Sequence, residues 1–361
     1  MKRLKVGLIG QGRSGKDIHA RTLSLLPEKY EIAAVADLLE DRQLTARQHF
    51  ACKTFKSLDQ MLSHCPDLDL VVNASPSHLH IPLTEKTLKA GYNVLCDKPF
   101  GRRWKDVDRL AALAREQHKT LAVFQQSRFA PYFHQVKAVV DSGVLGRIIM
   151  VKISFNSYAR RWDWQTLRCF DGGNLLNTGP HPLDQALHFI GRDAVPEVTA
   201  IMDRVNTFGD AEDHVKLILR REGHPTIDLE VSSCCAYNPY VYMVYGSRGS
   251  LAGTMNHIEW KYFRESEAPH QTLIREPMPN LAYCSEQLPF HEEKWDAPSE
   301  AASNLFDYMA CAYYKNLYDN LTTGAPLEVT LAQVRQQIAV IQEAHRQNKS
   351  YTRKVASRNH G

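Results

Sequence analysis

The first third of the chain alternates short apolar runs with segments in which apolar positions recur every three or four residues. The apolar runs are rich in Val, Ile and Leu and lack polar alternation, a pattern typical of parallel strands that are buried on both faces. The intervening segments, such as Ile81–Ala90 and Trp104–Gln117, have the apolar spacing of amphipathic helices. This alternation predicts an α/β fold with a doubly wound parallel sheet of the Rossmann type. The predicted strands are Leu4–Ile9, Glu31–Ala36, Leu68–Ala74, Asn93–Cys96 and Thr120–Phe124.

After Phe124 the pattern changes to an amphipathic helix, Pro131–Ser142, followed by strand-like segments separated by turn residues. These segments predict a second α/β domain with a large, mainly antiparallel sheet. The Pro- and charge-rich segment Glu265–Glu300 is expected to be an irregular excursion, and a final helix near Leu331–Gln347 precedes a polar tail that we expect to be frayed. We therefore predict a Rossmann domain over residues 1–124 and a second domain over residues 125–361. The strands predicted for the second sheet are Ile148–Tyr158, Glu197–Asp203, His214–Arg220, Thr226–Ser232, Tyr240–Gly246 and Ser250–Met255.

The composition narrows the class of protein. The 361 residues are 43% hydrophobic and 23% charged, and the net charge of +4 comes from basic residues spread along the chain. Without a concentrated cationic face we expect no nucleic-acid or membrane partner. No apolar run approaches the roughly 18 residues of a membrane span, and the N-terminal residues lack the long apolar core of a secretory signal. The eight cysteines form no C-x-x-C pair, which favours reduced thiols and a cytoplasmic location.

A glycine-rich turn directly follows the first predicted strand. The pattern G-x-G-x-x-G permits a tight turn, lets the backbone approach a pyrophosphate and places that anion at a helix N-terminus. The second predicted strand ends at Asp37, whose carboxylate can accept hydrogen bonds from ribose hydroxyls and would repel a 2′-phosphate. These signals predict NAD as the cofactor, and the nearby Arg13 leaves NADP open. The turn consists of Gly10, Gln11, Gly12, Arg13, Ser14 and Gly15.

Four further motifs follow in order, at residues 71–80, 94–99, 124–129 and 172–184. They include Ser75-Pro76-Ser77-His78, the tripeptide Asp97-Lys98-Pro99 and the run Gly172-Gly173-Asn174-Leu175-Leu176-Asn177-Thr178-Gly179-Pro180-His181-Pro182-Leu183-Asp184. From its N-terminus to about residue 191 the chain resembles the Gfo/Idh/MocA family, the group around glucose–fructose oxidoreductase and inositol dehydrogenase. The resemblance implies an NAD(P)-dependent oxidoreductase with the two-domain fold described above.

The resemblance also implies a set of residues at the cofactor. Besides the glycine turn and Asp37, the expected contacts are Ser75, Pro76, His78, His80, Asp97, Lys98 and Gln126. The two histidines also invite interpretation as metal ligands, but two such residues without a third ligand at a recognised spacing are weak evidence. We expect no metal.

Oxidation of a secondary alcohol requires a base for the hydroxyl proton and an acceptor for the hydride. Imidazole has a suitable pKa without tuning, so His181 is the candidate base, and the ammonium of Lys98 is the candidate group that stabilises the developing alkoxide. In the family that the chain resembles, a lysine and a histidine hold these positions. Without that resemblance, Lys98 reads as a solvated turn residue and His181 as an ordinary residue at a helix start.

The expected substrate contacts are Lys98, Arg128, Trp164, Asn177, His181 and Asp184. Asn177 departs from the family, which commonly has Asp there, and an amide can hydrogen-bond a hydroxyl but cannot take its proton. If this stretch forms one helix, Asn177, His181 and Asp184 share a face. Trp164 lies in an aromatic and basic stretch, residues 158–164, which could either line a sugar site or form an ordinary loop.

These features predict hydride transfer between a nicotinamide cofactor and a secondary hydroxyl of a sugar, glycoside or cyclic polyol. Two alternatives remain: an enzyme that cleaves glycosides with recycled NAD, and a non-catalytic protein that senses a ligand. The large sheet would leave one face in need of cover, so we expect a homodimer or homotetramer.

Overall fold

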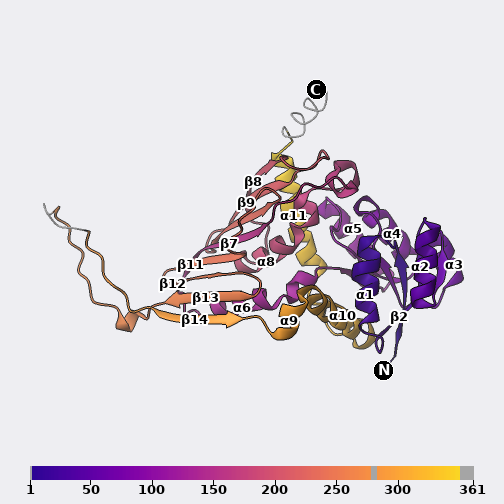
Figure 1. Cartoon of the computed structure of the whole chain (residues 1–361), viewed down its shortest axis with the longest axis horizontal. Coiled ribbons are helices and arrows are strands. Elements are labelled where there is room, and N and C mark those ends of the chain that lie inside the picture. The colour runs from indigo at the N-terminus through magenta and orange to yellow at the C-terminus, as the bar shows by residue number, and fades with distance from the viewer. Residues whose placement is uncertain (1, 278–282, 350–361) are drawn as a thin grey trace.

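The computed structural model describes residues 2–277 and 283–349, and its strands form two sheets (Figure 1). The first sheet is parallel throughout, in the order β3-β2-β1-β4-β5-β6. The direction of winding reverses between β1 and β4, and ligands of such sheets bind at this point, beyond the carboxyl ends of the strands. The predicted doubly wound sheet is confirmed. Its strands are β1 (Leu4–Ile9), β2 (Tyr30–Ala36), β3 (Lys53–Phe55), β4 (Leu70–Asn73), β5 (Asn93–Cys96) and β6 (Leu121–Val123).

Both faces of this sheet are covered. Val6 and Leu8 of β1 point into the main core, whereas Ile9 points into a second cluster with Leu58 and Met61 of α3. Burial on both faces explains why the strand sequences lack polar alternation. The helical segments of this part are η1 (Ser14–Ala20), α1 (Arg21–Ser24), α2 (Glu40–Phe50), α3 (Leu58–His64), η2 (Ser77–Leu79), α4 (His80–Lys89) and α5 (Trp104–Glu116).

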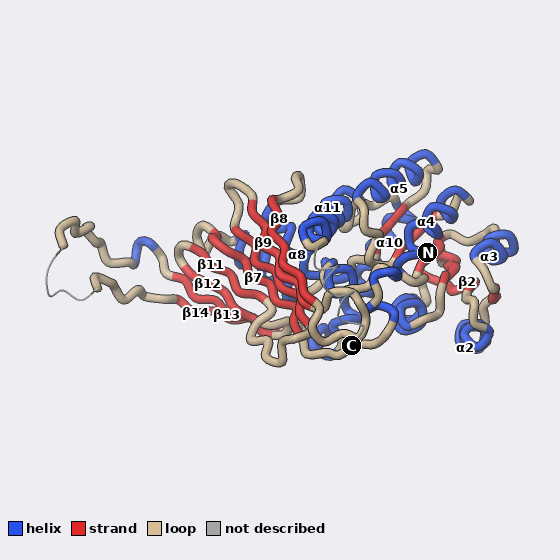
Figure 2. The backbone as a smooth tube through the Cα atoms, turned by 90° about the horizontal axis from the view of Figure 1, so that it is seen from above, coloured by secondary structure: helices blue, strands red, loops and turns tan. Residues whose placement is uncertain are grey.

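The second sheet is mixed and mostly antiparallel, in the order β14-β13-β12-β11-β7-β10-β9-β8, with β7 and β10 as the one parallel pair between its named strands. This confirms the predicted second sheet. Helices α8 (Pro180–Ile190), α6 (Pro131–Asp141) and α11 (Leu331–Gln347) pack on one face (Figure 2). The strands are β7 (Ile148–Asn156), β8 (Glu197–Asp203), β9 (His214–Arg220), β10 (Thr226–Ser232), β11 (Tyr242–Gly246), β12 (Gly249–Gly253), β13 (His257–Tyr262) and β14 (His291–Asp296).

The prediction of an irregular excursion over Glu265–Glu300 is wrong in part. His291–Asp296 is an edge strand that pairs with β13 in a regular register, from Tyr262 opposite His291 to His257 opposite Asp296. Its sequence is dominated by charged residues because only one face of an edge strand packs on the core. The chain between the two strands projects from the sheet as an arm (Figures 1 and 2), which contains the short helix η6 (Glu265–Glu267) and includes residues outside the described range. Helix α9 (Ser299–Ser303) ends the segment.

A long helix, α10 (Leu305–Thr323), was not predicted. It returns from the second sheet to the first, where its tyrosines bond to the backbone: Tyr313 Oη donates to Val123 O, and Tyr318 Oη donates to Lys2 O, both at 2.7 Å. Tyr30 Oη of β2 in turn donates to Tyr314 O at 2.7 Å. The C-terminal part of the chain therefore stabilises the first sheet, and the boundary at residue 124 stays a prediction.

Two further observations concern membrane-spanning helices and the C-terminal tail. Among them, no helix is both long and apolar enough to cross a lipid bilayer. The polar tail that we expected to be frayed lies outside the described residues, since these end at residue 349.

Candidate functional site

The motifs predicted from the sequence follow the carboxyl ends of strands β1, β4, β5 and β6. Because these strands are parallel, their carboxyl ends meet at one edge of the sheet. The glycine turn follows β1, Ser75 follows β4, Asp97 follows β5 and Gln126 follows β6. The second domain adds the segment that carries Asn177 and His181.

The glycine turn has the shape that a dinucleotide needs. Gly10 has φ +87°, and a Cβ there would come within 2.7 Å of the Ala74 carbonyl oxygen, while a Cβ on Gly15 would collide with the carbonyl of Gly10. By contrast, the nearest atom to a Cβ on Gly12 would be Arg42 Nη1 at 3.7 Å, so the middle of the turn is open. The side-chain nitrogen Gln11 Nε2 is buried without a hydrogen-bond partner. These features fit a pyrophosphate at the start of η1.

Asp37 at the end of β2 is buried and already holds the glycine turn. Its Oδ2 accepts from the Gln11 backbone nitrogen at 2.7 Å, and Oδ1 accepts from the Leu39 backbone nitrogen at 2.9 Å. Each carboxylate oxygen has a second lone pair, which leaves acceptors for ribose hydroxyls. Arg42 Nη1 lies 3.4 Å from Oδ2 and provides a cation beside this carboxylate.

Asp97 joins the glycine turn to the strand end that carries Lys98. Ser14 Oγ donates to Asp97 Oδ2, and the Lys98 backbone nitrogen donates to Oδ1 at 2.8 Å. Burial opposes ionisation of Asp97, but the ring of His19, 3.8 Å away, and the ammonium of Lys98 hold the pKa of this carboxyl well below its usual range. Asp97 is thus a fixed negative charge behind Lys98.

Lys98 is half-buried and reaches across to the second domain. Its Nζ donates to the backbone carbonyl of Asn177 at 2.9 Å. Burial lowers the pKa of the Lys98 ammonium, and the positive charges of Arg13 and Arg161 add to this, against the opposing effect of Asp97. The contact places the ammonium of Lys98 against Asn177, four residues before His181 in the chain.

His181 lies near the start of α8, and its Nδ1 is 3.2 Å from Ser127 Oγ. Burial lowers the pKa of the imidazole to about 3, and the charge of Lys98 contributes to the shift. The ring is therefore neutral at physiological pH. Nε2 has no hydrogen-bond partner among residues 2–277 and 283–349, so it is open to a substrate hydroxyl, but a pKa of about 3 makes the ring a weaker base than the unshifted imidazole assumed in the sequence analysis.

Arg128 and Asp184, both predicted as substrate contacts, face each other in the interior. Arg128 Nε and Nη2 each lie 2.7 Å from a carboxylate oxygen of Asp184, and Nη1 donates to Glu328 O and Gln333 Oε1. Burial disfavours the charge on Asp184, but Arg128, with a smaller effect from Arg192, lowers the pKa of the carboxyl. The pair joins the short helix η3 (Gln126–Phe129) to α8, and its role at a substrate stays a prediction.

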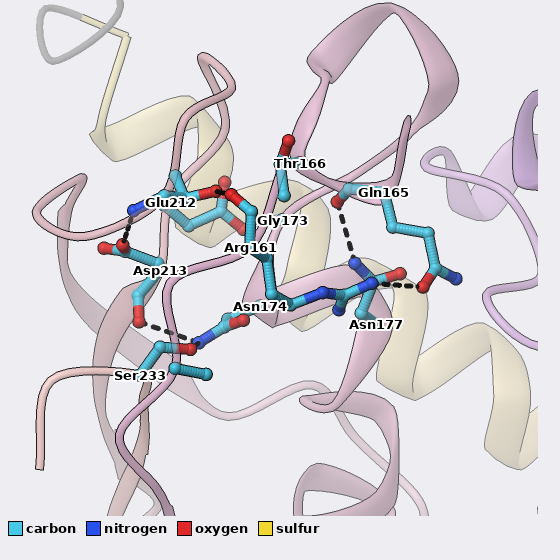
Figure 3. A pocket seen from close by; sticks show the side chains of 11 residues that line it. Arg161, Gln165, Thr166, Gly173, Asn174, Asn177, Glu212, Asp213 and Ser233 are labelled. Carbon is cyan, nitrogen blue, oxygen red and sulfur yellow. Dashed lines mark hydrogen bonds between the residues drawn. The ribbon is translucent and has the colours of Figure 1, made fainter. Parts of the chain in front are cut away.

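Asn177 and His181 lie in separate helices, so the condition for a shared helical face is not met. Helix α7 (Asn174–Asn177) ends before α8, because Pro180, the first residue of α8, has no backbone N–H to continue a helix from α7. Asn177 Nδ2 donates to the Gln165 carbonyl at 2.9 Å, and Oδ1 is buried without a partner. Figure 3 shows Asn177 and Gln165 beside Arg161 in the adjoining pocket.

The remaining predicted residues lie around the same edge. The indole of Trp164 is 39% exposed and packs edge-on against Phe170, which in turn contacts the ring of His78. His78 Nδ1 and Gln126 Oε1 are buried without partners. Ser75 is half-exposed and Pro76 is exposed.

His80 has a different environment from the other predicted cofactor contacts. Its two ring nitrogens lie 2.8 Å from Pro99 O and 2.9 Å from Ser75 O, and burial lowers its pKa. Its ring connects the turn after β4 with the turn after β5, and its contact with the cofactor stays a prediction. In the described part of the chain, no group of three or more His, Cys, Asp or Glu side chains is arranged to hold a metal.

Sequence reasoning missed Ser127, Arg42 and Glu212. Ser127 stands between two residues that were singled out, but nothing in its sequence context shows that its hydroxyl faces His181. Arg42 follows Asp37 by five residues, in the first turn of α2, and a basic residue at this place could have been noted as a candidate cofactor contact. Glu212 gave no signal, since its surroundings are created by tertiary packing.

Comparison with known proteins agrees with this arrangement. Residues 4–125 match the family described as "Oxidoreductase family, NAD-binding Rossmann fold", and residues 133–252 match the GFO/IDH/MocA C-terminal domain. The chain is 24% identical over 354 residues to the scyllo-inositol 2-dehydrogenase (NADP(+)) IolW of Bacillus subtilis, which covers 96% of this chain and 94% of that protein.

Two other relatives are similar over different extents. The dTDP-3,4-didehydro-2,6-dideoxy-alpha-D-glucose 3-reductase of Streptomyces violaceoruber is 34% identical over 164 residues, 45% of this chain and 48% of that protein. The structure of the WlbA dehydrogenase from Bordetella pertussis, in complex with NADH and UDP-GlcNAcA, has a TM-score of 0.77 at 23% identity, covering 97% of this chain and 96% of that one. With both domain matches in chain order, the protein belongs to the Gfo/Idh/MocA family of NAD-binding oxidoreductases.

Proposed function

We propose that this protein transfers a hydride between a nicotinamide cofactor and a secondary hydroxyl of a sugar, glycoside or cyclic polyol. The observation that carries the proposal is the contact of Lys98 with the Asn177 carbonyl, which brings a partly desolvated ammonium to the segment that holds a neutral, unoccupied imidazole, His181. A base and a cation at one site are what alcohol oxidation requires.

In this scheme His181 Nε2 takes the proton from the substrate hydroxyl, and Ser127 Oγ holds the other ring nitrogen. The ammonium of Lys98 stabilises the negative charge that develops on the substrate oxygen. A bound nicotinamide would supply the acceptor for the hydride that leaves the carbon bearing this oxygen. Asp97 keeps Lys98 in place and compensates its charge. In the reverse direction His181 returns the proton to a carbonyl oxygen.

The substrate class rests on two kinds of support. Two of the relatives are named for an inositol and for a nucleotide-linked sugar as substrate. Trp164 presents an indole beside the segment that carries Asn177, and the apolar face of a sugar ring stacks on such a surface. Asn177 can hydrogen-bond a hydroxyl group, but it supplies no carboxylate.

The proposal is tested by following nicotinamide absorbance with NAD and NADP over a panel of sugars, glycosides and inositols. Lys98→Ala and His181→Ala should each lower kcat at least about a hundredfold while cofactor binding persists, because each removes a group that acts mainly in the transition state. Lys294→Ala on the exposed edge strand β14 is the matched control.

Other results on the same panel would favour the alternatives. Release of a free sugar with no net NADH would indicate a glycoside-cleaving enzyme that recycles its NAD. Tight cofactor binding without turnover on any substrate, and without any effect of Lys98→Ala, would indicate a ligand-sensing protein.

We also propose that the chain forms a homodimer or homotetramer through the face of the second sheet opposite α6, α8 and α11. On that face Ile201 of β8 is 61% exposed, and Met243 and Tyr245 of β11 are partly exposed. Light scattering tests this proposal, and a monomer would contradict it. A cytoplasmic location stays a prediction; the eight cysteines are all unpaired.

A further inference from the structure

Glu212 is a buried carboxyl that the proposed chemistry does not use. It lies in the loop before β9, and its side chain is only 4% exposed. No basic side chain forms an ion pair with it in the part of the chain that the structure describes. Such a group normally has a structural or catalytic reason, because burying an unpaired carboxylate is costly.

The side chain of Glu212 caps a helix that is distant in sequence. Its Oε1 accepts a hydrogen bond from the Leu175 backbone nitrogen at 3.1 Å, and its own carbonyl accepts one from the Asn174 backbone nitrogen at 2.9 Å. The first N–H groups of a helix have no partner within the helix, so these two bonds satisfy the start of α7. Figure 3 shows Glu212 beside Gly173 and Asn174.

The residue before α7 is adapted to this contact. Gly173 has φ +110°, and a Cβ there would collide with both carboxyl oxygens of Glu212. A Cβ on the neighbouring Gly172 would collide with the Gln165 carbonyl. The two glycines therefore let the loop close tightly over the carboxyl of Glu212.

Helix α7 leads directly to the reactive groups. It ends at Asn177, whose carbonyl receives the Lys98 ammonium, and His181 follows near the start of α8. We propose that Glu212 is a positioning residue: by accepting the Leu175 N–H it fixes α7 and, through the Asn177 carbonyl, the ammonium of Lys98. The inference rests on the proposed function, which assigns the reactive role to Lys98.

The surroundings of Glu212 disfavour its charged form, so the carboxyl is protonated below about pH 7 and partly ionised at neutral pH. Burial raises the pKa of Glu212 to about 7, and its backbone contacts and the distant charges of Arg168 and Arg102 only partly oppose this. Arg102 also faces Asp171 at 3.4 Å, so its charge is shared.

The other charged groups around the same pocket are engaged elsewhere. Arg161 forms two bonds with Asp163, at 2.9 and 2.7 Å, and Asp213 accepts three backbone N–H groups of the loop 205–207. The pocket has about 10 Å³ for water, close to one molecule. Ionisation of Glu212 would strengthen the bond from the Leu175 N–H but would bury a charge that no basic side chain pairs with in the described part of the chain, and this net cost destabilises the folded protein.

The test compares the wild type with Glu212→Gln, which keeps a side-chain oxygen for Leu175 but cannot ionise. The pKa of Glu212 is higher in the folded chain than its ordinary 4.5, so its contribution to stability is complete below pH 4.5 and is lost as the pH rises through 7. The Tm of the wild type should therefore fall relative to that of Glu212→Gln between pH 5 and 8. Histidine titrations are common to both proteins and cancel in this difference.

Two further readouts separate positioning from bulk stability. The infrared C=O band of a protonated carboxyl should be present in the wild type at pH 6, lost by pH 8, and absent from Glu212→Gln. With an active substrate, the wild type should lose kcat above pH 7 with little change in KM for cofactor, Glu212→Gln should show a flatter profile, and Glu212→Ala should lose about tenfold in kcat, as expected for one lost hydrogen bond.

The matched control is Asp210→Asn, because Asp210 lies two residues away and also accepts a backbone N–H, that of Arg168, at 2.8 Å. It should retain the wild-type pH dependence. Identical pH dependence of Tm in the wild type and Glu212→Gln, or full kcat in Glu212→Ala, would overturn the proposal. The Tm and infrared measurements need no substrate, so they test Glu212 even if no hydride transfer is found.

Discussion

At the scale of single residues, Arg128 and Asp184 show how a polar motif can serve the interior. Their bidentate ion pair is buried, and Arg192 lies 3.4 Å from the same carboxylate. Removing one member of a buried pair leaves the other charge without compensation, which costs more than the pair contributes.

We therefore expect Arg128→Ala to lower the free energy of unfolding by about 3–5 kcal/mol. Denaturant unfolding measures the change, and Arg160→Ala, which removes an exposed arginine, should change stability little. If Arg128→Ala instead kept its stability and lost affinity for substrate, the original prediction of a substrate contact would be supported.

We expect Asp37 and Arg42 together to set the preference between the two nicotinamide cofactors. The carboxylate disfavours a 2′-phosphate, whereas the guanidinium 3.4 Å away favours one. Asp37→Ser should therefore shift the ratio of kcat/KM for NADP to that for NAD upward by about tenfold or more. Asp41→Ser, an exposed position on α2, is the control. An unchanged ratio would mean that the adenosine ribose does not lie at Asp37.

At the scale of elements, Gly173 connects local backbone geometry to the site. Gly173→Ala combines a left-handed φ with a collision against Glu212, and should lower the free energy of unfolding by about 2–4 kcal/mol. Gly223→Ala has φ +76° but no atom within 4 Å of the new Cβ, so it reports the backbone cost alone. Equal losses in thermal unfolding of the two variants would show that Glu212 does not crowd the loop.

The elements that sequence reasoning found are those with a strong local pattern. Strands β1, β2, β4 and β5 are apolar because both faces are buried, and the alternation in β8 reflects its single buried face. The motif residues of the first domain were found because their position after parallel strands brings them to one edge.

Most of the missed elements have weak patterns for physical reasons, but β13 (His257–Tyr262), which was also missed, alternates buried and exposed residues and could have been predicted. Strand β3 has three residues, and β14 carries charged side chains on a sheet edge. Helix α10 does bury one face, but three of its six buried residues are tyrosines, so the contrast between apolar and polar positions along its sequence is weak. The break between α7 and α8 falls at Pro180, which has no backbone N–H to continue a helix, so the sequence did contain a signal for it.

At the scale of the whole molecule, buried histidines couple stability to pH. Burial, the largest cause in each, lowers the pKa of His181 and His188 to about 3 and that of His345 to about 4. Between about pH 4 and 6.5 the unfolded chain binds protons at these rings that the folded chain does not, so their contribution to stability is complete above pH 6.5 and falls as the pH is lowered. Glu212 acts in the opposite direction between pH 4.5 and about 7.

Since the histidines outnumber Glu212, the free energy of unfolding in urea should increase from pH 4.5 to 6.5. His188→Gln should make this slope shallower, because one of the titrating rings is gone, whereas replacement of the exposed His49 should change it less. A slope that is unchanged in His188→Gln would show that this ring is protonated in the folded protein.

The register at the base of the arm has a practical consequence. Tyr262 and His291 are direct partners across β13 and β14, and their rings stack at 5.4 Å. The chain therefore leaves the sheet and re-enters it at neighbouring positions on paired strands. The pairing of β13 with β14 thus does not depend on how long the segment between them is. A tight two-residue loop, or a whole foreign domain whose ends lie close together, could replace it while every backbone pair of the hairpin is kept, which makes this position suitable for grafting a reporter far from the nucleotide-binding edge.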